Sequence, residues 1–458
     1  MSVRSPGRPR ASVANLIALV ACCGVIFWSL RVVRDSNPTR SRLRQLRSGS
    51  VEDRKVAAIA LGMVGPEEVG AAVPALIAAL EDEDAKVRGL AALSLSSQFH
   101  SKVPPLGGST KAGSGPTPGF DAREPIAALD RATRDRDRAV RIEALSALAS
   151  VSPFAGGGPP PGLLACLTDG DVDVRAHAVK VLGSFRPDDS LIPTLLRIAG
   201  RDDPVVVHAC RDTLFSSRPS KALAPSLIGA LHHRDRRVRA MIPPLLGRIG
   251  PDAVAAVPDL VAMLKEPVDP ESIDDPWGRV SVWRWDQSMA AEALGAIAPG
   301  TASAGEAVAA LTDALGHDDE RCDAAARALI RLGVDATPAA PALVAALRRF
   351  NAAAAAAMKR GLAWSPDSVV EALGLLAPGT ASAGEAVAAL TDALGPYEWT
   401  SLRAAKALAR FGPAAAPAVP RLLGFKDSRD SALRAAAASA LEAIDRPPST
   451  GPRAVPRP

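Results

Sequence analysis

Residues 298–316 read APGTASAGEAVAALTDALG, and residues 377–395 repeat the same nineteen residues letter for letter. The alignment of the two copies continues without a gap on both sides, from Trp285, which falls on Trp364, to Pro341, which falls on Pro420. A block of about 60 residues has been duplicated in tandem. Self-similarity at a fixed period is typical of stacked supersecondary units, which form an array that grows by adding repeats. We therefore predict a repeat array in place of a single-core globule.

The composition favours closely packed helices. Hydrophobic residues make up 48% of the 458 residues, mostly Ala and Leu, whereas aromatic residues make up 3%. Alanine is the best helix former, and few bulky side chains keep helices apart. Residues 1–50 hold nine of the 54 basic residues and one of the 49 acidic ones. The other 408 residues hold 45 basic and 48 acidic residues, a net charge of −3. The repeats thus offer no basic stripe for a phosphate backbone, and we predict no nucleic-acid partner.

An uncharged stretch near the N-terminus predicts a membrane anchor. Residues 11–30 read ASVANLIALVACCGVIFWSL and are flanked by Arg10 and Arg31. At about 1.5 Å per residue, a helix of about twenty residues spans roughly 30 Å, the thickness of the hydrocarbon core. Trp28 lies near one end, where interfacial aromatic residues are favoured. We expect a basic leader over residues 1–10 and one transmembrane helix over residues 11–30.

Two other interpretations of this stretch stay open. Residues 19–22 read LVAC, which resembles the lipobox of bacterial lipoproteins, in which the cysteine, here Cys22, is acylated after cleavage. A cleaved signal peptide has the same order of basic and apolar residues. Against both, the stretch stays apolar through Trp28, past the cleavage point. Three Arg precede the span and six follow it up to Arg47, which slightly favours a cytoplasmic C-terminal side. We expect a single-pass protein of the bacterial inner membrane.

After this stretch the sequence repeats a unit of two helices. The first helix begins at or near a proline, which a first turn tolerates because its N–H has no partner within the helix. The second helix follows an acidic turn with an Asp, a Val three residues on and an Arg four residues on. We predict that the Asp caps the helix, the Val points inward and the Arg lies on the side of the Asp. The prolines are Pro74, Pro258, Pro341 and Pro420, and the acidic turns begin at Asp84, Asp137, Asp171 and Asp235.

This pattern, with a small-residue face and a closing Leu-Gly-x-Ile/Val-Gly, resembles HEAT repeats, especially the short bacterial subtype similar to that of phycobilin lyases. The resemblance covers residues 38–445 and implies an all-α solenoid of about ten to eleven helical hairpins. It also implies that the Asp and Arg residues are structural and form ladders between neighbouring repeats. Two units depart from the pattern, because Val207 and Val370 stand near the position of the expected Arg.

Longer connections interrupt the units and gather the aromatic residues. We predict flexible insertions at residues 101–122, 151–161, 265–284 and 350–363, and a disordered Pro- and Arg-rich tail at residues 446–458. Five of the six tryptophans and the only tyrosine fall on turns between the two helices of a unit: Trp277, Trp283, Trp285, Trp364, Tyr397 and Trp399. Since Trp and Tyr are enriched at interface hot spots, this tryptophan edge is a candidate protein-binding ridge. The alternative is that these side chains fill gaps beneath irregular loops.

No catalytic or metal-binding pattern is present in the sequence. None of the six histidines forms a pair at metal-ligand spacing or lies near a cysteine pair. Residues 169–173 read DGDVD and are similar to the start of a calcium loop. However, Val174 stands where that loop needs glycine and Lys180 where it needs the closing Glu, so we predict a capping turn. We expect no catalytic, cofactor-binding or metal-binding residues, and buried thiols at Cys166, Cys210 and Cys322.

These observations favour one function and leave one alternative. We expect a membrane-anchored HEAT-repeat scaffold for protein–protein interaction, with no catalysis of its own and no cofactor. Its partner would be a protein or peptide bound along the concave face or the tryptophan edge. The alternative, which the repeat subtype implies, is an enzyme similar to phycobilin lyases or a chaperone of cofactor attachment.

Overall fold

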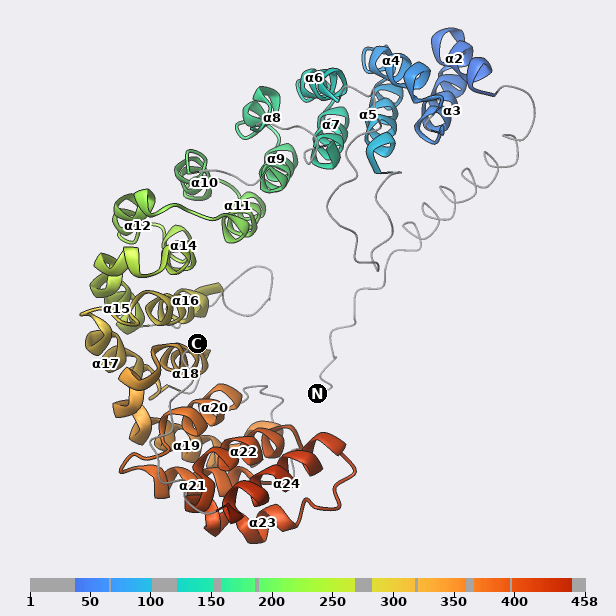
Figure 1. Cartoon of the computed structure of the whole chain (residues 1–458). Helices are drawn as coiled ribbons and strands as arrows, with labels where there is room; N and C mark the ends of the chain where they lie inside the picture. The colour runs from blue at the N-terminus through green and yellow to red at the C-terminus, as the bar shows by residue number, and fades with distance from the viewer. Residues whose placement is uncertain are drawn as a thin grey trace, which may run out of the picture. The chain divides into compact units, whose positions relative to one another are not determined.

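The structure is a computed structural model that describes residues 38–65, 67–100, 122–151, 158–185, 189–267, 282–317, 320–359, 366–395 and 398–446 (Figure 1). Every regular element in these ranges is a helix, and the ranges contain no strand. The predicted leader and anchor, residues 1–30, lie outside the described residues, as does the tail beyond residue 446.

The helices follow one another along the chain as eleven consecutive pairs within the described ranges. Their contacts divide the chain into two compact units. The first unit comprises Met1–Pro187 and Asp203–Thr213, and the second comprises Asp188–Asp202 and Leu214–Pro458. The earlier member of each pair is called the first helix below, and the later member the second helix.

The first unit contains four complete pairs. They are α2 (Pro38–Ser48) with α3 (Val51–Gly62), α4 (Val69–Ala79) with α5 (Ala85–His100), α6 (Arg123–Ala132) with α7 (Arg138–Val151), and α8 (Pro161–Cys166) with α9 (Val172–Ser184). Of the next pair, α10 (Ile192–Ala199) belongs to the second unit and most of α11 (Pro204–Ser216) to the first.

The second unit contains six complete pairs, and several of their helices are preceded by a 3₁₀ turn. They are η2 (Lys221–Leu223) and α12 (Ala224–Ala230) with α13 (Arg236–Arg239) and α14 (Ile242–Ile249); η3 (Gly250–Ala256) and α15 (Val257–Lys265) with α16 (Val282–Ile297); α17 (Ala304–Ala314) with α18 (Glu320–Leu332); η5 (Gly333–Ala339) and α19 (Ala340–Lys359) with α20 (Asp367–Leu376); α21 (Ala383–Ala393) with α22 (Glu398–Phe411); and η6 (Gly412–Ala418) and α23 (Val419–Leu423) with α24 (Ser431–Asp445).

The second helices pack against one another in chain order within each unit. Helices α3, α5, α7 and α9 do so in the first unit, and α14, α16, α18, α20, α22 and α24 do so in the second. Their contacts are made by small and medium side chains, such as Ala91 and Leu95 of α5 and Ala144 and Leu148 of α7, all with no exposed surface. The alanine-rich composition therefore serves close packing between helices, and the predicted all-α repeat architecture is confirmed in each unit.

Glycine allows neighbouring second helices to approach closely. A Cβ atom added at Gly374 of α20 would lie 2.8 Å from Cβ and 2.9 Å from Cα of Ala407 in α22. At the duplicated position, a Cβ atom at Gly295 of α16 would lie 2.6 Å from Cα of Ala328 in α18. Both residues take the place of the first glycine of Leu-Gly-x-Ile/Val-Gly. The second glycine of that pattern, Gly250, has a φ of 74° and ends α14, in a conformation that favours glycine.

The predicted prolines lie within first helices, but not always in the first turn. Pro258 of α15 and Pro420 of α23 lie in the first turn, as predicted. Pro74 instead lies inside α4, which begins five residues earlier at Val69. A proline inside a helix removes one backbone donor, so α4 tolerates the loss of one intrahelical hydrogen bond.

Two of the predicted insertions are partly helical. Helix α16 begins at Val282, so the last three residues of the 265–284 stretch are helical. Helix α19 continues to Lys359, so the first ten residues of the 350–363 stretch are helical as well. An alanine-rich sequence explains this extension, because residues 352–357 are all alanine.

One stretch of the described residues, Glu320–Ala352, is long and apolar enough to cross a membrane. It is interrupted at Gly333, which has a φ of 62° and begins η5. Its first half, α18, packs against α16 and α20 and buries Cys322 and Leu329. The stretch therefore consists of core elements of two successive repeats.

Candidate functional site

The turns that join the first helix of a pair to the second, called the turn edge below, carry capping aspartates in the first unit. Asp84, Asp137 and Asp171 each accept a hydrogen bond from the backbone N–H two residues further on. The valines three residues after each aspartate are buried: Val87, Val140 and Val174. The predicted roles of the Asp and the Val are confirmed, and Asp171 of the DGDVD stretch is a helix cap.

A second aspartate, two residues before each cap, links neighbouring repeats. It accepts the backbone N–H of the capping residue and also pairs with an arginine of the preceding repeat. That arginine donates through Nη1 to a backbone carbonyl of its own turn. A ladder between repeats is therefore present as predicted, but these arginines pair with the second aspartate and not with the capping aspartate of the predicted motif. The pairs are Arg54 with Asp82 at 2.8 Å, Arg88 with Asp135 at 2.6 Å and Arg141 with Asp169 at 2.9 Å.

The pair of Arg88 and Asp135 is the most buried of these, with 5% and 11% of the two side chains exposed. Arg88 donates from Nε and Nη2 to the two carboxylate oxygens of Asp135, at 2.6 and 2.9 Å. Burial acts to raise the pKa of Asp135, but the hydrogen bonds from Arg88 and from the N–H of Asp137 outweigh it and lower that pKa. The carboxylate is therefore held in its charged form, as a bidentate ladder contact requires.

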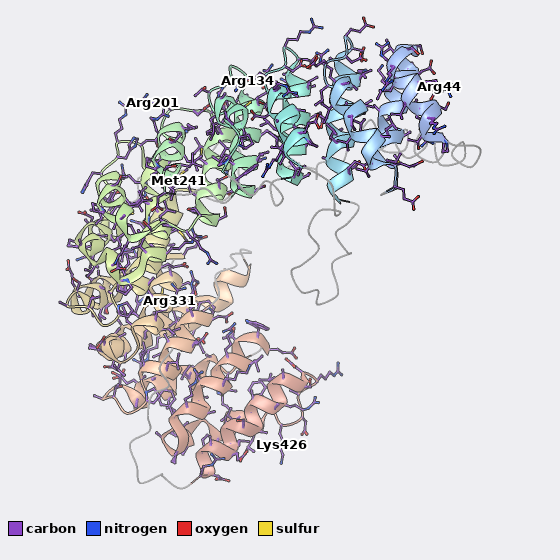
Figure 2. All side chains as sticks on the ribbon, turned by 45° about the horizontal axis from the view of Figure 1, so that its top comes forward. Arg44, Arg134, Arg201, Met241, Arg331 and Lys426 are labelled. Carbon is purple, nitrogen blue, oxygen red and sulfur yellow. The ribbon has the colours of Figure 1, made fainter. Side chains whose placement is uncertain are left out.

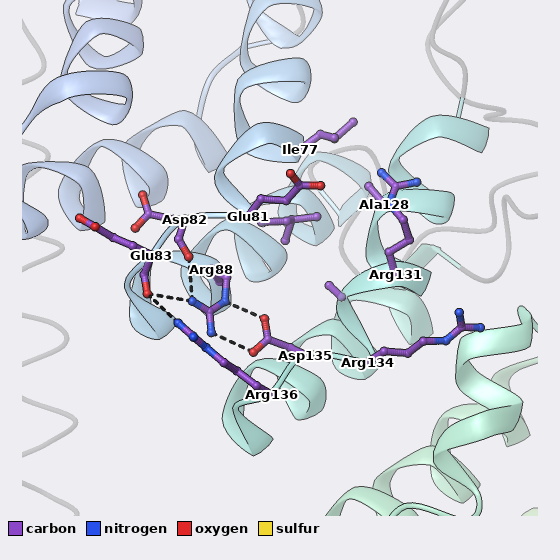
Figure 3. Close-up of a pocket in the computed structure, with 12 residues that line it drawn as sticks. Ile77, Glu81, Asp82, Glu83, Arg88, Ala128, Arg131, Arg134, Asp135 and Arg136 are labelled. Carbon is purple, nitrogen blue, oxygen red and sulfur yellow. Dashed lines mark hydrogen bonds and ion pairs between the residues drawn. The ribbon is translucent and has the colours of Figure 1, made fainter.

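A groove of about 470 Å³ opens beside this pair, between the α4–α5 turn and α6 (Figure 3). Glu81, Asp82 and Glu83 contribute carboxylates from the α4–α5 turn. Arg131 comes from the end of α6 and Arg134 from the turn that follows it, and both are exposed. The charges of the two sides are opposite and largely balanced, so the groove has no strong preference for an anion or a cation.

A second groove of the first unit, about 550 Å³, lies one repeat further on. It is lined by Arg134, which also lines the groove beside Arg88 and is marked in Figure 2, by the ladder pair Arg141 and Asp169, and by Cys166. Burial raises the pKa of the Cys166 thiol, which donates a hydrogen bond to the carbonyl oxygen of Thr133 at 3.3 Å. Cys166, Cys210 and Cys322 are all buried, as predicted.

In the second unit, Trp399 lies in the first turn of α22 with 59% of its surface exposed. Its indole Nε1–H donates a hydrogen bond to Oδ2 of Asp367, the first residue of α20, at 2.7 Å. The guanidinium of Arg403, one turn along α22, lies 5.4 Å from the centre of the indole ring. Arg403 also contacts Glu371 of α20 at 3.4 Å. The tryptophan is therefore exposed to solvent yet held in one orientation.

A groove of about 220 Å³ adjoins this tryptophan on the α20–α22 surface. Glu371 lines its α20 side, while Trp399, Arg403, Lys406 and Arg410 line it from α22. Lys406 and Arg410 are exposed. The groove thus combines an aromatic wall with three cations and one carboxylate, a combination that suits a polypeptide segment with both apolar and acidic side chains.

The structure places one of the six predicted edge residues in full. Trp277, Trp364 and Tyr397 lie outside the described residues. Trp283 and Trp285 fall in the first turn of α16, where the structure describes the backbone and not these two side chains. The tryptophan edge therefore stays a prediction for five of its members.

The cations beside Trp399 were not predicted from the sequence. A signal for them was present, because Trp399, Arg403, Lys406 and Arg410 follow each other at spacings of four, three and four residues. That spacing places side chains on one face of a helix. Within the described ranges, no group of three His, Cys, Asp or Glu side chains could hold a metal ion.

Comparisons with known proteins agree with the helical pairs. Residues 160–225 match the family described as HEAT repeats, and residues 53–82 match the family described as PBS lyase HEAT-like repeat. Among curated proteins, none matches this chain.

Two crystal structures of importin beta are similar in fold. One, from a polyethylene glycol condition, is 13% identical, with 89% of this chain and 60% of that chain covered and a TM-score of 0.63. The other, from an ammonium sulfate condition, is 13% identical, with 88% and 57% covered and a TM-score of 0.61. This chain thus spans less than two thirds of the length of either importin beta chain, and the likeness concerns the fold. The two repeat matches identify HEAT repeats in this chain and support a HEAT-repeat family, in agreement with the paired helices and their capped turns.

Proposed function

We propose that this chain is a scaffold for protein–protein interaction that binds its partner at the turn edge around Trp399. The observation that carries the proposal is the exposed indole of Trp399, which Asp367 and Arg403 hold in place beside a groove. A side chain already held in its bound orientation loses little conformational entropy on binding. Tryptophan and arginine are the residues most enriched among interface hot spots.

Site-specific photo-crosslinking tests this function. A photoreactive amino acid is placed at position 399 of the full-length chain in its native cells, and crosslinked proteins are identified by mass spectrometry. The matched control places it at position 320, because Glu320 is the counterpart of Trp399 in the first copy of the duplication. We expect a defined partner at position 399 and none, or a much weaker signal, at position 320. Equal crosslinking at both positions, or none at either, would refute the scaffold proposal.

We also propose that residues 11–30 tether this scaffold to the bacterial inner membrane, with a slight preference for a cytoplasmic solenoid. The support is the uncharged run of these residues and the Arg residues on both sides of it. A tether would confine the turn edge to a thin layer next to the membrane, which raises the effective concentration of a partner confined to the same layer.

The lyase alternative rests on the match of residues 53–82. That match covers α3 from Asp53 onward and all of α4. These helices belong to the fold, and a fold hosts many functions. Incubation of the full-length chain with a bilin tests the alternative, since a bound tetrapyrrole would appear as colour that co-purifies with the protein.

A further inference from the structure

The tandem duplication supplies an internal comparison for the α22 surface. Helices α18 and α22 occupy the same place in the two copies. Their cores are alike, but several positions around Trp399 differ, some of them exposed and some buried. The aligned residues are Glu320 and Trp399, Asp323 and Leu402, Ala324 and Arg403, Arg327 and Lys406, and Arg331 and Arg410.

In the first copy the charges on this surface are balanced. Two acidic and two basic residues occupy the five positions of α18, a net charge of zero. Arg327 pairs with Asp323 on its own helix, and with Glu292 of α16 at 2.7 Å. Arg327 is therefore neutralised by the chain itself, whereas Arg331 is exposed.

In the second copy the same surface carries three cations and no acid among the five positions of α22, a net charge of +3. Leu402 replaces the acid that would pair within the helix. Glu371, the counterpart of Glu292, contacts Arg403 instead. Lys406 and Arg410 are exposed, and neither has an ion-pair partner among the described residues. In the second copy the two carboxylates of α20, Asp367 and Glu371, pair with Arg403, and Lys406 lacks the ion pairs that its counterpart Arg327 makes.

We propose that the surface of α22 formed by Trp399, Arg403, Lys406 and Arg410 docks an acidic peptide segment of the partner protein. An apolar side chain of the segment enters the 220 Å³ groove beside the indole, and its carboxylates pair with Lys406 and Arg410. This inference rests on the proposed scaffold function and names the chemistry of the partner. Charge complementarity sets the choice of partner and speeds association.

The same groove argues against a phosphate-rich ligand. Glu371 lines it, and Asp367 bonds the indole, so two carboxylates border the cations. Closely spaced phosphates of a membrane or a nucleic acid would meet this repulsion, whereas a peptide can place its few carboxylates away from it. The net charge of −3 over residues 51–458 opposes a polyanion in the same way.

Fluorescence anisotropy with the full-length chain in neutral detergent tests the inference. The probe is a fluorescein-labelled peptide of twelve residues with five Glu and one Leu, and the matched probe has Lys in place of each Glu. We expect the acidic probe to bind and the basic one not to bind. The double variant Lys406→Glu, Arg410→Glu should weaken binding of the acidic probe by about tenfold or more, and salt should weaken binding to the wild type.

The control variant is Arg331→Glu, since Arg331 is the exposed counterpart of Arg410 on α18 (Figure 2). It should bind the acidic probe as the wild type does. Circular dichroism of each variant verifies that the helices are intact. A Trp399→Phe variant removes the hydrogen bond to Asp367 but keeps an aromatic wall, and it should retain part of the affinity.

Two results would overturn the inference. One is equal affinity of the wild type and the double variant for the acidic probe. The other is a double variant that loses binding to vesicles of equimolar phosphatidylglycerol and phosphatidylcholine while its affinity for the acidic probe is unchanged. That result would assign the surface to a membrane. Crosslinking at position 399 distinguishes a failure of the acidic-segment inference from a failure of the scaffold proposal. A partner that is still captured when the double mutation is added leaves the scaffold in place and refutes the acidic segment.

Discussion

At the scale of the residue, the aspartate that precedes each cap has two functions. Asp135 accepts the N–H of Asp137, which shapes its own turn, and receives Arg88 from the preceding repeat. One carboxylate therefore couples the local conformation of a turn to its neighbour. In the sixth pair His233 takes this place, and its Nδ1 accepts the N–H of Asp235 at 3.0 Å. The turn survives that replacement because an imidazole nitrogen is also an acceptor.

The ladder pair leads to the first prediction. Arg88→Ala should lower the free energy of unfolding by about 3–5 kcal/mol, because it leaves the buried carboxylate of Asp135 without its partner. Arg138→Ala is the matched control, since Arg138 pairs with Asp171 and Asp173 but is 59% exposed, and it should cost less than about 1 kcal/mol. Urea unfolding with hydrogen exchange of α5 and α7 measures both. Similar losses in the two variants would contradict this account of the ladder.

Glu143 of α7 leads to a prediction with a pH dependence. Burial raises the pKa of Glu143, so its charged form opposes folding at neutral pH. Glu143→Gln should therefore raise the unfolding temperature at pH 7. As the pH falls through the raised pKa, the native carboxyl takes up a proton and this cost disappears. Below about pH 4.3, the usual pKa of glutamate, the two proteins should unfold alike. A gain that is constant with pH would show that the charge of Glu143 is not its cause.

At the scale of the element, the distance between second helices depends on single glycines. Gly374→Ala should destabilise the second unit by about 1–3 kcal/mol, because its Cβ would press on the backbone of Ala407. Gly384→Ala in α21 is the control, since a Cβ atom there meets nothing within 4 Å. Alanine is the better helix former, so this control should be neutral or stabilising by up to about 1 kcal/mol. The urea midpoint and hydrogen exchange of α20 and α22 measure both, and equal effects would refute the close-contact argument.

For the molecule as a whole, the proposed tether is open to a direct experiment. The full chain in a bacterial host should remain in the membrane fraction after extraction with alkaline carbonate. Deletion of residues 1–37 should move it to the soluble fraction, because those residues contain the proposed span. Cys22→Ala distinguishes the lipoprotein interpretation, since a retained helix does not need the cysteine. Release of the Cys22→Ala variant would support acylation, and release of the unaltered chain would refute the tether.

The order of residues along the chain was enough to predict the repeat architecture and its capped turns. Caps, buried valines and turn glycines could be predicted because each depends on residues a few positions apart in the chain. The tandem duplication adds to this, because it repeats the same local signals in order.

Which charges meet across repeats could be known only from the packed helices. Arg54, Arg88 and Arg141 reach forward to the following turn, whereas Arg403 reaches back to Glu371 of the preceding second helix. The partners lie 28 to 47 residues apart, so the choice depends on how neighbouring helices pack and not on local spacing. The same packing leaves Lys406 and Arg410 exposed beside Trp399, because burial and pairing are properties of the assembled surface.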